Sequence, residues 1–470
     1  MSSSNNITTA NNPLGTSPVG KLMWKFSVPA TISMLVGSLY NIVDQIFIGQ
    51  GVGMLGNAAT NIAFPISILS TALALLIGIG GASGFNLESG KGNDKKAVNI
   101  MGVSIGCLVI CGTVLMIIAL AFGSPLMKFF GASKNVLPYA VDYVTYTAYG
   151  MPFLTLTTGG NHLIRADRNP TISMICMMTG AILNTILDPI FIFVFGWGIK
   201  GAAIATSFSQ FVSGILVIAY FAGIGKKRNV HLHFKQFIPK IKYIEVILSL
   251  GFASFINQIA MAIIQVVLNN TLKYYGGISH YGADIPLAAV GVISKLNMVF
   301  MSFAIGIAQG CQPIWGFNYG AEKYDRVIHT YKNALRATIV VGIIFFMCFQ
   351  IFPKQLLSLF GHGNSAYYKF AVKYLRIFMF LTFVNGIQPM SSQFFTAIGK
   401  ALLGAIMSLT RQVIFLLPLL VILPKIMGVE GVMFAGPVAD FAAFSVAIIF
   451  ALKQIANMKK LLEKKTKVEL

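Results

Sequence analysis

Apolar runs long enough to cross a lipid bilayer recur along almost the whole chain, and they restrict its fold more than any other feature. A transmembrane helix needs about 20 predominantly apolar residues. With 56% hydrophobic and only 10% charged residues among 470, the chain leaves no room for a soluble domain. The sequence therefore predicts an all-α membrane protein with twelve transmembrane helices, near residues 24–49, 57–87, 97–122, 137–160, 171–195, 201–224, 244–272, 285–316, 331–352, 367–396, 402–424 and 431–456.

The formal net charge of +21 is explained by where the basic residues lie relative to the membrane. If the amino terminus lies inside, the cytoplasmic segments hold most of the lysine and arginine, including Lys95, Lys96 and the cluster at 226–242. Positive residues gather in cytoplasmic loops and attract the anionic lipid of the inner leaflet. We therefore expect a multi-pass protein of the cytoplasmic (plasma) membrane with both termini inside. Its partner is then the lipid bilayer, and we expect no nucleic acid partner.

The chain repeats itself once, with a period near half its length. Residues 126–131 (LMKFFG) match residues 356–361 (LLSLFG), and residues 198–201 (GIKG) match residues 428–431 (GVEG), both at an offset of 230 positions. Six helices per half give both halves the same direction of membrane entry, which predicts two parallel six-helix repeats. The predicted boundaries are a flexible tail at 1–19, an N-lobe at 20–225, a basic cytoplasmic linker at 226–243, a C-lobe at 244–456 and a basic cytoplasmic tail at 457–470.

Two aspartates, Asp44 and Asp188, lie inside apolar runs, where an ionised carboxylate is costly to place. At about 1.5 Å per residue, both lie roughly 8–12 Å below the outer ends of their helices, so they can face one cavity. Asn184 shares the helix face of Asp188, and Thr206 supplies a hydroxyl at a similar depth. Such a site can exchange a proton, a metal cation or an organic cation. A purely structural role also stays open, because Asp188 precedes the helix break at Pro189.

The sequence offers little for enzymatic chemistry. It contains no nucleotide-binding loop, no His-Glu-x-x-His segment and no Gly-x-Ser-x-Gly turn. The five cysteines lie in apolar runs and form no disulfide or zinc pattern, at Cys107, Cys111, Cys176, Cys311 and Cys348. We therefore expect no enzyme and no cofactor, with H⁺ or Na⁺ as the coupling ion.

Several polar side chains are candidates for a substrate cavity. Tyr40 and Asn41 precede Asp44 on the first predicted helix, and Lys295 lies about 15 Å inside its helix, as a counter-charge or a gating residue. The C-terminal half contributes Asn257, Gln258, Gln265, Gln309 and Gln388, together with Gln312, Asn385 and Gln393. Hydrogen bonding between helices is an equally open role for these amides. We expect Arg411 to reach the inner surface, and Asp142 and Asp440 to serve packing or topology.

Five segments resemble the MATE (multidrug and toxic compound extrusion) transporters of the MepA-like bacterial branch. They are 17–29 (SPVGKLMWKFSVP), 165–170 (RADRNP), 187–193 (LDPIFIF), 201–206 (GAAIAT) and 312–321 (QPIWGFNYGA), and they recur in order. The resemblance implies two six-helix lobes arranged as a V, export of cationic amphiphiles, and coupling to inward H⁺ or Na⁺. It also implies that Asp44, Asn184, Asp188 and Thr206 form the cation site of the N-lobe, and a metal site if the coupling ion is Na⁺.

The sequence departs from this family pattern at two places. Arg168 stands where glycine is common after Arg-Ala-Asp. Met261 and Ile387 occupy positions that are acidic in some branches. With no acidic residue at these two C-lobe positions, a single N-lobe site serves coupling, and we favour H⁺ because a proton needs only one carboxylate.

Three classes of function fit the sequence to different degrees. The leading one is a cation-coupled antiporter that exports small organic cations, as a monomer, by alternating access. The alternative is a flippase for lipid-linked cell-wall or polysaccharide precursors, which would favour a basic cavity for pyrophosphate. A membrane enzyme or receptor is the third, and the repeated halves and the missing catalytic constellation argue against it.

Overall fold

The computed structural model describes residues 12–224, 228–282, 284–360 and 364–469, which are mostly helical and contain no β-strand. The N-terminal half contains α1 (Pro13–Thr16), α2 (Val19–Gly51), α3 (Met54–Gly90), α4 (Asp94–Phe129), α5 (Leu137–Ala148), α6 (Met151–Ala166), α7 (Pro170–Pro189), η2 (Ile190–Val194) and α8 (Gly198–Ala222). The C-terminal half contains η3 (Phe234–Gln236), α9 (Ile241–Gly277), α10 (Asp284–Gly320), α11 (Tyr324–Ile351), α12 (Pro353–Ser358), α13 (Ser365–Phe378), α14 (Thr382–Asn385), α15 (Ile387–Ala397), α16 (Ala401–Leu409), η4 (Thr410–Leu416), α17 (Leu417–Met427) and α18 (Val429–Glu469).

Ten helices of the described residues are long and apolar enough to cross a membrane, and the bent pair α13 and α14–α15 gives up to eleven. The all-α membrane fold is thus confirmed. The remaining predicted span, 137–160, corresponds to α5 and α6, which are separated at Tyr149 and Gly150. Pro152 lies in the first turn of α6. Because proline donates no N–H, it favours the start of a new helix over the continuation of an old one.

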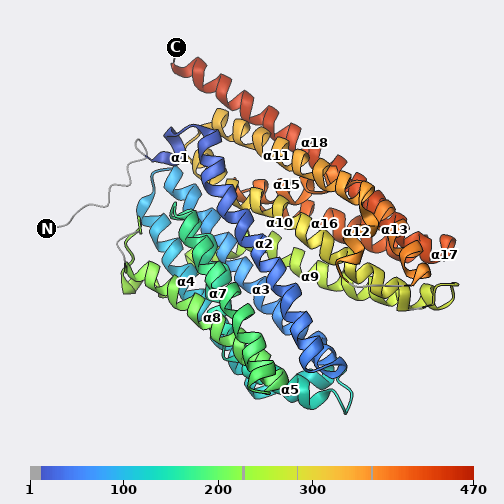
Figure 1. Cartoon of the computed structure of the whole chain (residues 1–470). Helices are drawn as coiled ribbons and strands as arrows, with labels where there is room; N and C mark the ends of the chain where they lie inside the picture. Colours follow the sequence, from blue (N-terminus) through green and yellow to red (C-terminus); the bar gives the residue numbers. More distant parts are fainter. Residues whose placement is uncertain (1–11, 225–227, 283, 361–363, 470) are drawn as a thin grey trace.

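The helices form two bundles arranged as a V (Figure 1). One bundle contains α2 to α8 and the other α9 to α18. They meet near α1 and diverge toward α5 at one tip and α17 at the other (Figure 1). Between the bundles, α2 packs along α10 and α3 along α9. We call the end near α1 the closed end and the opposite end, between α5 and α17, the open end.

At the closed end the two halves touch through glycines related by the sequence repeat. A methyl group on Gly90 would lie 2.1 Å from the carbonyl oxygen of Phe317, and one on Gly320 would lie 2.2 Å from that of Leu87. Gly320 follows Gly90, and Phe317 follows Leu87, by the same 230 positions as the repeated segments. A side chain at either glycine would push α3 and α10 apart. The two halves therefore approach each other symmetrically here.

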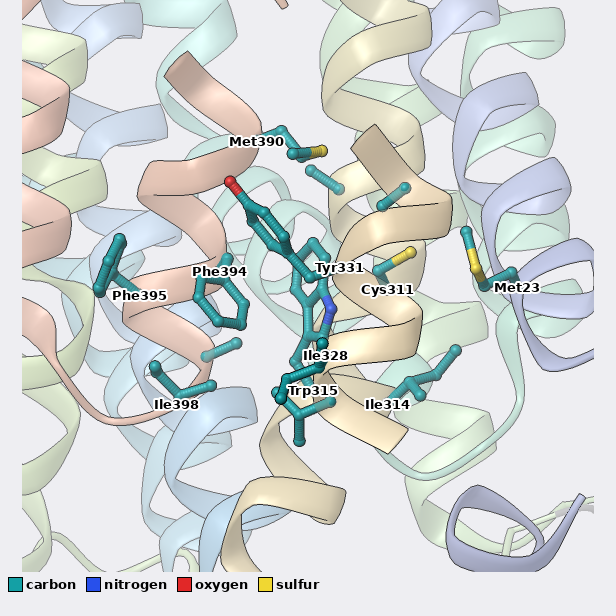
Figure 2. Packing of buried hydrophobic residues seen from close by; sticks show 14 of the residues in the cluster. Met23, Cys311, Ile314, Trp315, Ile328, Tyr331, Met390, Phe394, Phe395 and Ile398 are labelled. Carbon is teal, nitrogen blue, oxygen red and sulfur yellow. The ribbon is translucent and has the colours of Figure 1, made fainter. Parts of the chain in front are cut away.

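An aromatic cluster packs the C-terminal bundle (Figure 2). Phe394 of α15 lies 5.4 Å from Trp315 of α10 and 4.6 Å from Tyr331 of α11, measured between ring centroids. The Tyr331 hydroxyl shares a 2.8 Å hydrogen bond with Ser391. Met23 of α2 belongs to the same cluster (Figure 2). The apolar core thus continues from the C-terminal bundle onto the first long helix of the other one.

The predicted N-terminal tail, linker and C-terminal tail contain different amounts of ordered helix and contact in the structure. Residues 1–11 of the predicted tail lie outside the described residues. The part that follows is held by α11, because the Arg326 guanidinium donates to the carbonyls of Leu14 at 3.1 Å and Ser17 at 2.6 Å. The predicted linker at 226–243 contains η3, and the predicted tail at 457–470 continues α18 to Glu469.

Candidate functional site

Asp44 and Asp188 come from α2 and α7, which pack against each other. Asp188 and Pro189 end α7, and the π-helix η2 follows at once. The Phe195 N–H donates to the Ile190 carbonyl at 2.9 Å, an i→i+5 bond that widens the helical turn. Because proline donates no N–H to the preceding turn, the regular helix is weakened here, and π-bulges are frequent at functional sites. The chain thus changes its helical geometry directly beside the carboxylate.

Asn184 fixes the position of Asp188. Its Nδ2 donates to Asp188 Oδ1 at 3.1 Å and lies 3.3 Å from Thr206 Oγ1 of α8, to which it also donates. One amide therefore links α7 to α8 while it orients the carboxylate. The carboxyl groups of Asp44 and Asp188 lie close enough to interact electrostatically. Asp44, Asn184, Asp188 and Thr206 are thus brought together.

The acidic pair is shielded from solvent and from basic residues. Asp188 is fully buried and Asp44 is 9% exposed. No ion pair within the described residues includes either carboxylate. Three oxygens accept no hydrogen bond from the described residues: Asp44 Oδ1, Asp188 Oδ2 and Asn184 Oδ1. Buried oxygen acceptors without donors suit a proton or a small hard cation. The described residues form no cluster of three or more His, Cys, Asp or Glu that suits a metal ion.

Two tyrosines stand beside the carboxylates. Tyr40 lies one helical turn before Asp44, and Tyr143 comes from α5; both interact electrostatically with Asp44 and Asp188. Tyr143 also packs against the apolar cluster around Ile48. Tyr143 was not among the residues predicted from sequence, because its proximity depends on how α5 folds against α2. Asn41, which was predicted, is exposed and donates to the Gly37 carbonyl at 2.7 Å.

The polar candidates of the C-terminal half lie in several environments. Asn257 and Gln258 are half-buried, whereas Gln265 is exposed and donates to Asn269 at 3.0 Å. Gln388 is buried and donates to the Met407 carbonyl. Other buried amides make contacts between elements: Gln309 accepts from Arg165 at 3.1 Å and Gln312 donates to Ser83 at 2.9 Å. For Gln309, Gln312 and Gln388, hydrogen bonding is the role that the geometry supports.

Charged residues of the C-terminal half behave differently from one another. Lys295 is half-buried and takes part in no ion pair among the described residues. Arg411 does not reach the inner surface as expected. Instead it is buried, and its Nε donates to Asp440 Oδ1 of α18 at 2.6 Å. The carboxylate of Asp440 offsets the cost of burying the guanidinium, so the Arg411 side chain does not need to extend to the inner membrane surface.

The two departures from the family pattern have distinct surroundings. Arg168 has φ +68°, a left-handed conformation that costs roughly 1–2 kcal/mol in non-glycine residues. This backbone conformation explains why glycine is common at this position in the family pattern. Met261 is exposed, and Ile387 is almost fully buried.

A further buried aspartate lies outside the spans, in the loop between α6 and α7. Asp167 Oδ2 accepts from the Asn229 N–H at 2.9 Å and from the Tyr220 hydroxyl. Asp167 therefore ties the start of the predicted linker to the N-terminal bundle. Burial raises the pKa of Asp167 to about 6, against the opposing effect of these hydrogen bonds.

Comparison with known proteins supplies independent information. The family model MatE matches residues 29–190 and 253–422. The chain is 26% identical over 443 residues to the Multidrug export protein MepA of Staphylococcus aureus (strain MRSA252), covering 93% of this chain and 95% of that protein. It is 25% identical over 450 residues to MepA of Staphylococcus haemolyticus (strain JCSC1435), covering 94% and 96%. A solved structure described as the outward-facing conformation of a multidrug resistance MATE family transporter has a TM-score of 0.88 at 24% identity, covering 95% of this chain and 98% of that one.

Proposed function

This chain belongs to the MatE family of multidrug efflux transporters, and we propose that it exports cationic amphiphilic compounds in exchange for a coupling cation bound at Asp44 and Asp188. One observation carries the proposal: two carboxylates are buried close enough to interact electrostatically, and neither has a basic ion-pair partner among the described residues. A positive charge must therefore come from elsewhere when both are ionised. Either the coupling ion or the cargo can supply it.

Competition between the two follows from simple electrostatics. Two ionised carboxylates in a dry site repel each other, and each is poorly solvated. A proton removes the repulsion, and so does an organic cation. Because the proton and the organic cation each neutralise the same repulsion between the carboxylates, the binding of one excludes the binding of the other. Exchange of inward-moving ion for outward-moving drug requires that exclusion.

We favour H⁺ over Na⁺ as the coupling ion. Na⁺ needs several oxygen ligands at once, and Asp44, Asn184, Asp188 and Thr206 offer four side chains for such a shell. A proton needs only one carboxylate. The C-terminal half offers no second acidic site at Met261 or Ile387.

The surroundings of the site suit a flat organic cation. Tyr40 and Tyr143 lie near both carboxylates, and an aromatic face attracts a cation within about 6 Å of the ring centroid. Methionine and phenylalanine side chains adapt to ligands of different shapes, and the chain contains 21 Met and 37 Phe. The cargo class is therefore amphiphilic and cationic.

Orientation follows from the charges at the closed end. Exposed basic residues occur there in both halves, including Lys95 at the start of α4 and Lys332 of α11. Positive residues mark the cytoplasmic side, so we infer that the closed end faces the cytoplasm and that the V opens outward. Transport then proceeds by rocking of one lobe against the other within a monomer in the cytoplasmic membrane.

The flippase alternative receives less support. A pyrophosphate headgroup needs basic partners, whereas the site between α2 and α7 is acidic and contains no ion-paired lysine or arginine among the described residues.

Ethidium transport into inside-out vesicles tests the proposal when ΔpH and ΔNa⁺ are imposed separately. We expect ΔpH alone to drive transport, and Asp188→Asn to abolish it. Transport driven by ΔNa⁺ alone would overturn the choice of ion. If neither ΔpH nor ΔNa⁺ drives transport, the proposal of cation-coupled antiport is overturned.

A further inference from the structure

Two segments that carry the family resemblance, 165–170 and 312–321, take no part in the acidic site. They belong to opposite halves of the chain, and they meet where α6 contacts α10 toward the closed end. We propose that Arg165 and Gln309, supported by His162 and Gln312, form a latch that holds the two lobes together at this end. The latch must break in every transport cycle, so this inference rests on the alternating access proposed above.

Arg165 makes the first bond across the lobes. One terminal nitrogen of its guanidinium donates to Gln309 Oε1 of α10 at 3.1 Å. The same nitrogen lies 3.1 Å from His162 Nδ1, and the other donates to Ser173 Oγ of α7 at 3.4 Å. The N-terminal lobe thus positions the guanidinium from two helices, and the C-terminal lobe supplies the remaining acceptor.

Gln312 makes the second connection. It lies three residues after Gln309, so both side chains project from one face of α10. Its Nε2 donates to Ser83 Oγ of α3 at 2.9 Å, and its side chain lies close enough to His162 to interact with the imidazole. His162 therefore stands between Arg165 and Gln312. The network is continuous from α6 through α10 to α3.

The backbone around Gln309 explains why these side chains reach across. Gly310 follows Gln309, and a methyl group at this position would lie 2.4 Å from Ser27 Cα of α2. One turn earlier, a methyl group at Gly306 would lie 2.5 Å from Thr31 Cα. Helix α10 therefore touches the N-terminal lobe directly at its glycines. Separation of the lobes must remove Gln309 from Arg165.

The charge of Arg165 suits a reversible contact. Arg165 is 3% exposed, yet it takes part in no ion pair among the described residues. Its bonds are charge-assisted but go to neutral acceptors, so they are weaker than a buried ion pair. When the closed end opens, water can replace Gln309 at the guanidinium. By contrast, Arg411 pairs with a carboxylate inside one lobe, where no separation is needed.

Opposite substitutions at one position test the latch. Gln309→Glu places a carboxylate against Arg165 and should stabilise the closed end. Gln309→Leu removes the acceptor and leaves the buried guanidinium without it, which should favour opening. We expect population shifts of about tenfold in opposite directions, the size expected for one buried hydrogen bond to a charged group. Gln355→Glu is the matched control, because it adds the same charge to an exposed position of α12 in the same lobe.

The readout is the distance between spin labels at Lys95→Cys and Lys332→Cys, introduced after the five native cysteines are replaced by serine and measured by double electron–electron resonance. Both lysines are exposed, one in each half. If Gln309→Leu fails to fold, Gln312→Leu replaces it, since it removes the bond to Ser83 and should shift the distances in the same direction. Distances that move the same way in Gln309→Glu and Gln309→Leu, or no further than in Gln355→Glu, would overturn the latch.

This measurement requires no transport, so the two proposals fail separately. If Asp188→Asn retains coupled transport while Gln309→Glu and Gln309→Leu shift the distances in opposite directions, the latch is supported and the coupling site is refuted. If coupling is lost in Asp188→Asn but the shifts do not occur, the latch falls alone.

Discussion

Replacement of Asp188 by asparagine should separate the structural role of this position from its role in coupling. The amide has the shape of the carboxyl group. Its oxygen can still accept the bond that Asn184 Nδ2 now makes to Asp188 Oδ1 at 3.1 Å, and its own N–H₂ can donate to Asp44. We therefore expect the free energy of unfolding to stay within about 1 kcal/mol of the original value. The amide cannot take up a proton at neutral pH, so ΔpH-driven transport should fall to the rate of empty vesicles.

Substitution of Asp188 by leucine completes this prediction. Leucine leaves the buried Asn184 amide without its carboxylate acceptor, which costs about 1–3 kcal/mol. Thermal unfolding in detergent and ethidium transport in vesicles measure the two effects. Asp142→Asn is the control, because the Asp142 side chain is 40% exposed and lies 3.4 Å from Lys200, and transport should not change. Wild-type transport in Asp188→Asn, or a loss of stability as large as that of the leucine variant, would refute the reasoning.

Three further predictions concern stability, each measured by thermal unfolding. Arg168→Gly should stabilise the protein by about 1 kcal/mol, because φ is +68°; Arg168→Ala should not, because alanine keeps the strain. The pKa of Asp167 is raised from 3.8 to about 6, so its folded form binds a proton more tightly. Stability from this group should rise as pH falls from 7 to 4.5, and Asp167→Asn should lose that dependence. Arg411→Met and Asp440→Leu should each cost about 3–5 kcal/mol, whereas the double variant should recover most of the loss; no recovery would show that the pair does not act as a unit.

Features set by long stretches of sequence could be predicted well. Apolar runs located the helices, and five ordered segments indicated the family, which the MatE match confirms. The break at Tyr149 and Gly150 within one predicted span was missed because both parts are apolar. Only the local turn preference of Pro152 signals it.

Features set by helix rotation could not be predicted. Arg411 and Asp440 are 29 positions apart, and their contact depends on how η4 and α18 turn toward each other. Tyr143 approaches the acidic pair for a similar reason. The depths of Asp44 and Asp188 could be counted along their helices, but their proximity depends on the packing of α2 against α7. Sequence periodicity contains no such information about rotation.

Proton release on drug binding tests the central claim most directly. Ethidium is added to the purified protein in weakly buffered detergent at neutral pH, and both its binding and the change in pH are recorded. We expect about one proton released for each ethidium bound, because in the proposed mechanism the cation replaces a proton held at Asp44 and Asp188. The Asp44→Asn, Asp188→Asn double variant should release none. Ethidium binding without proton release from the unmodified protein would contradict the account.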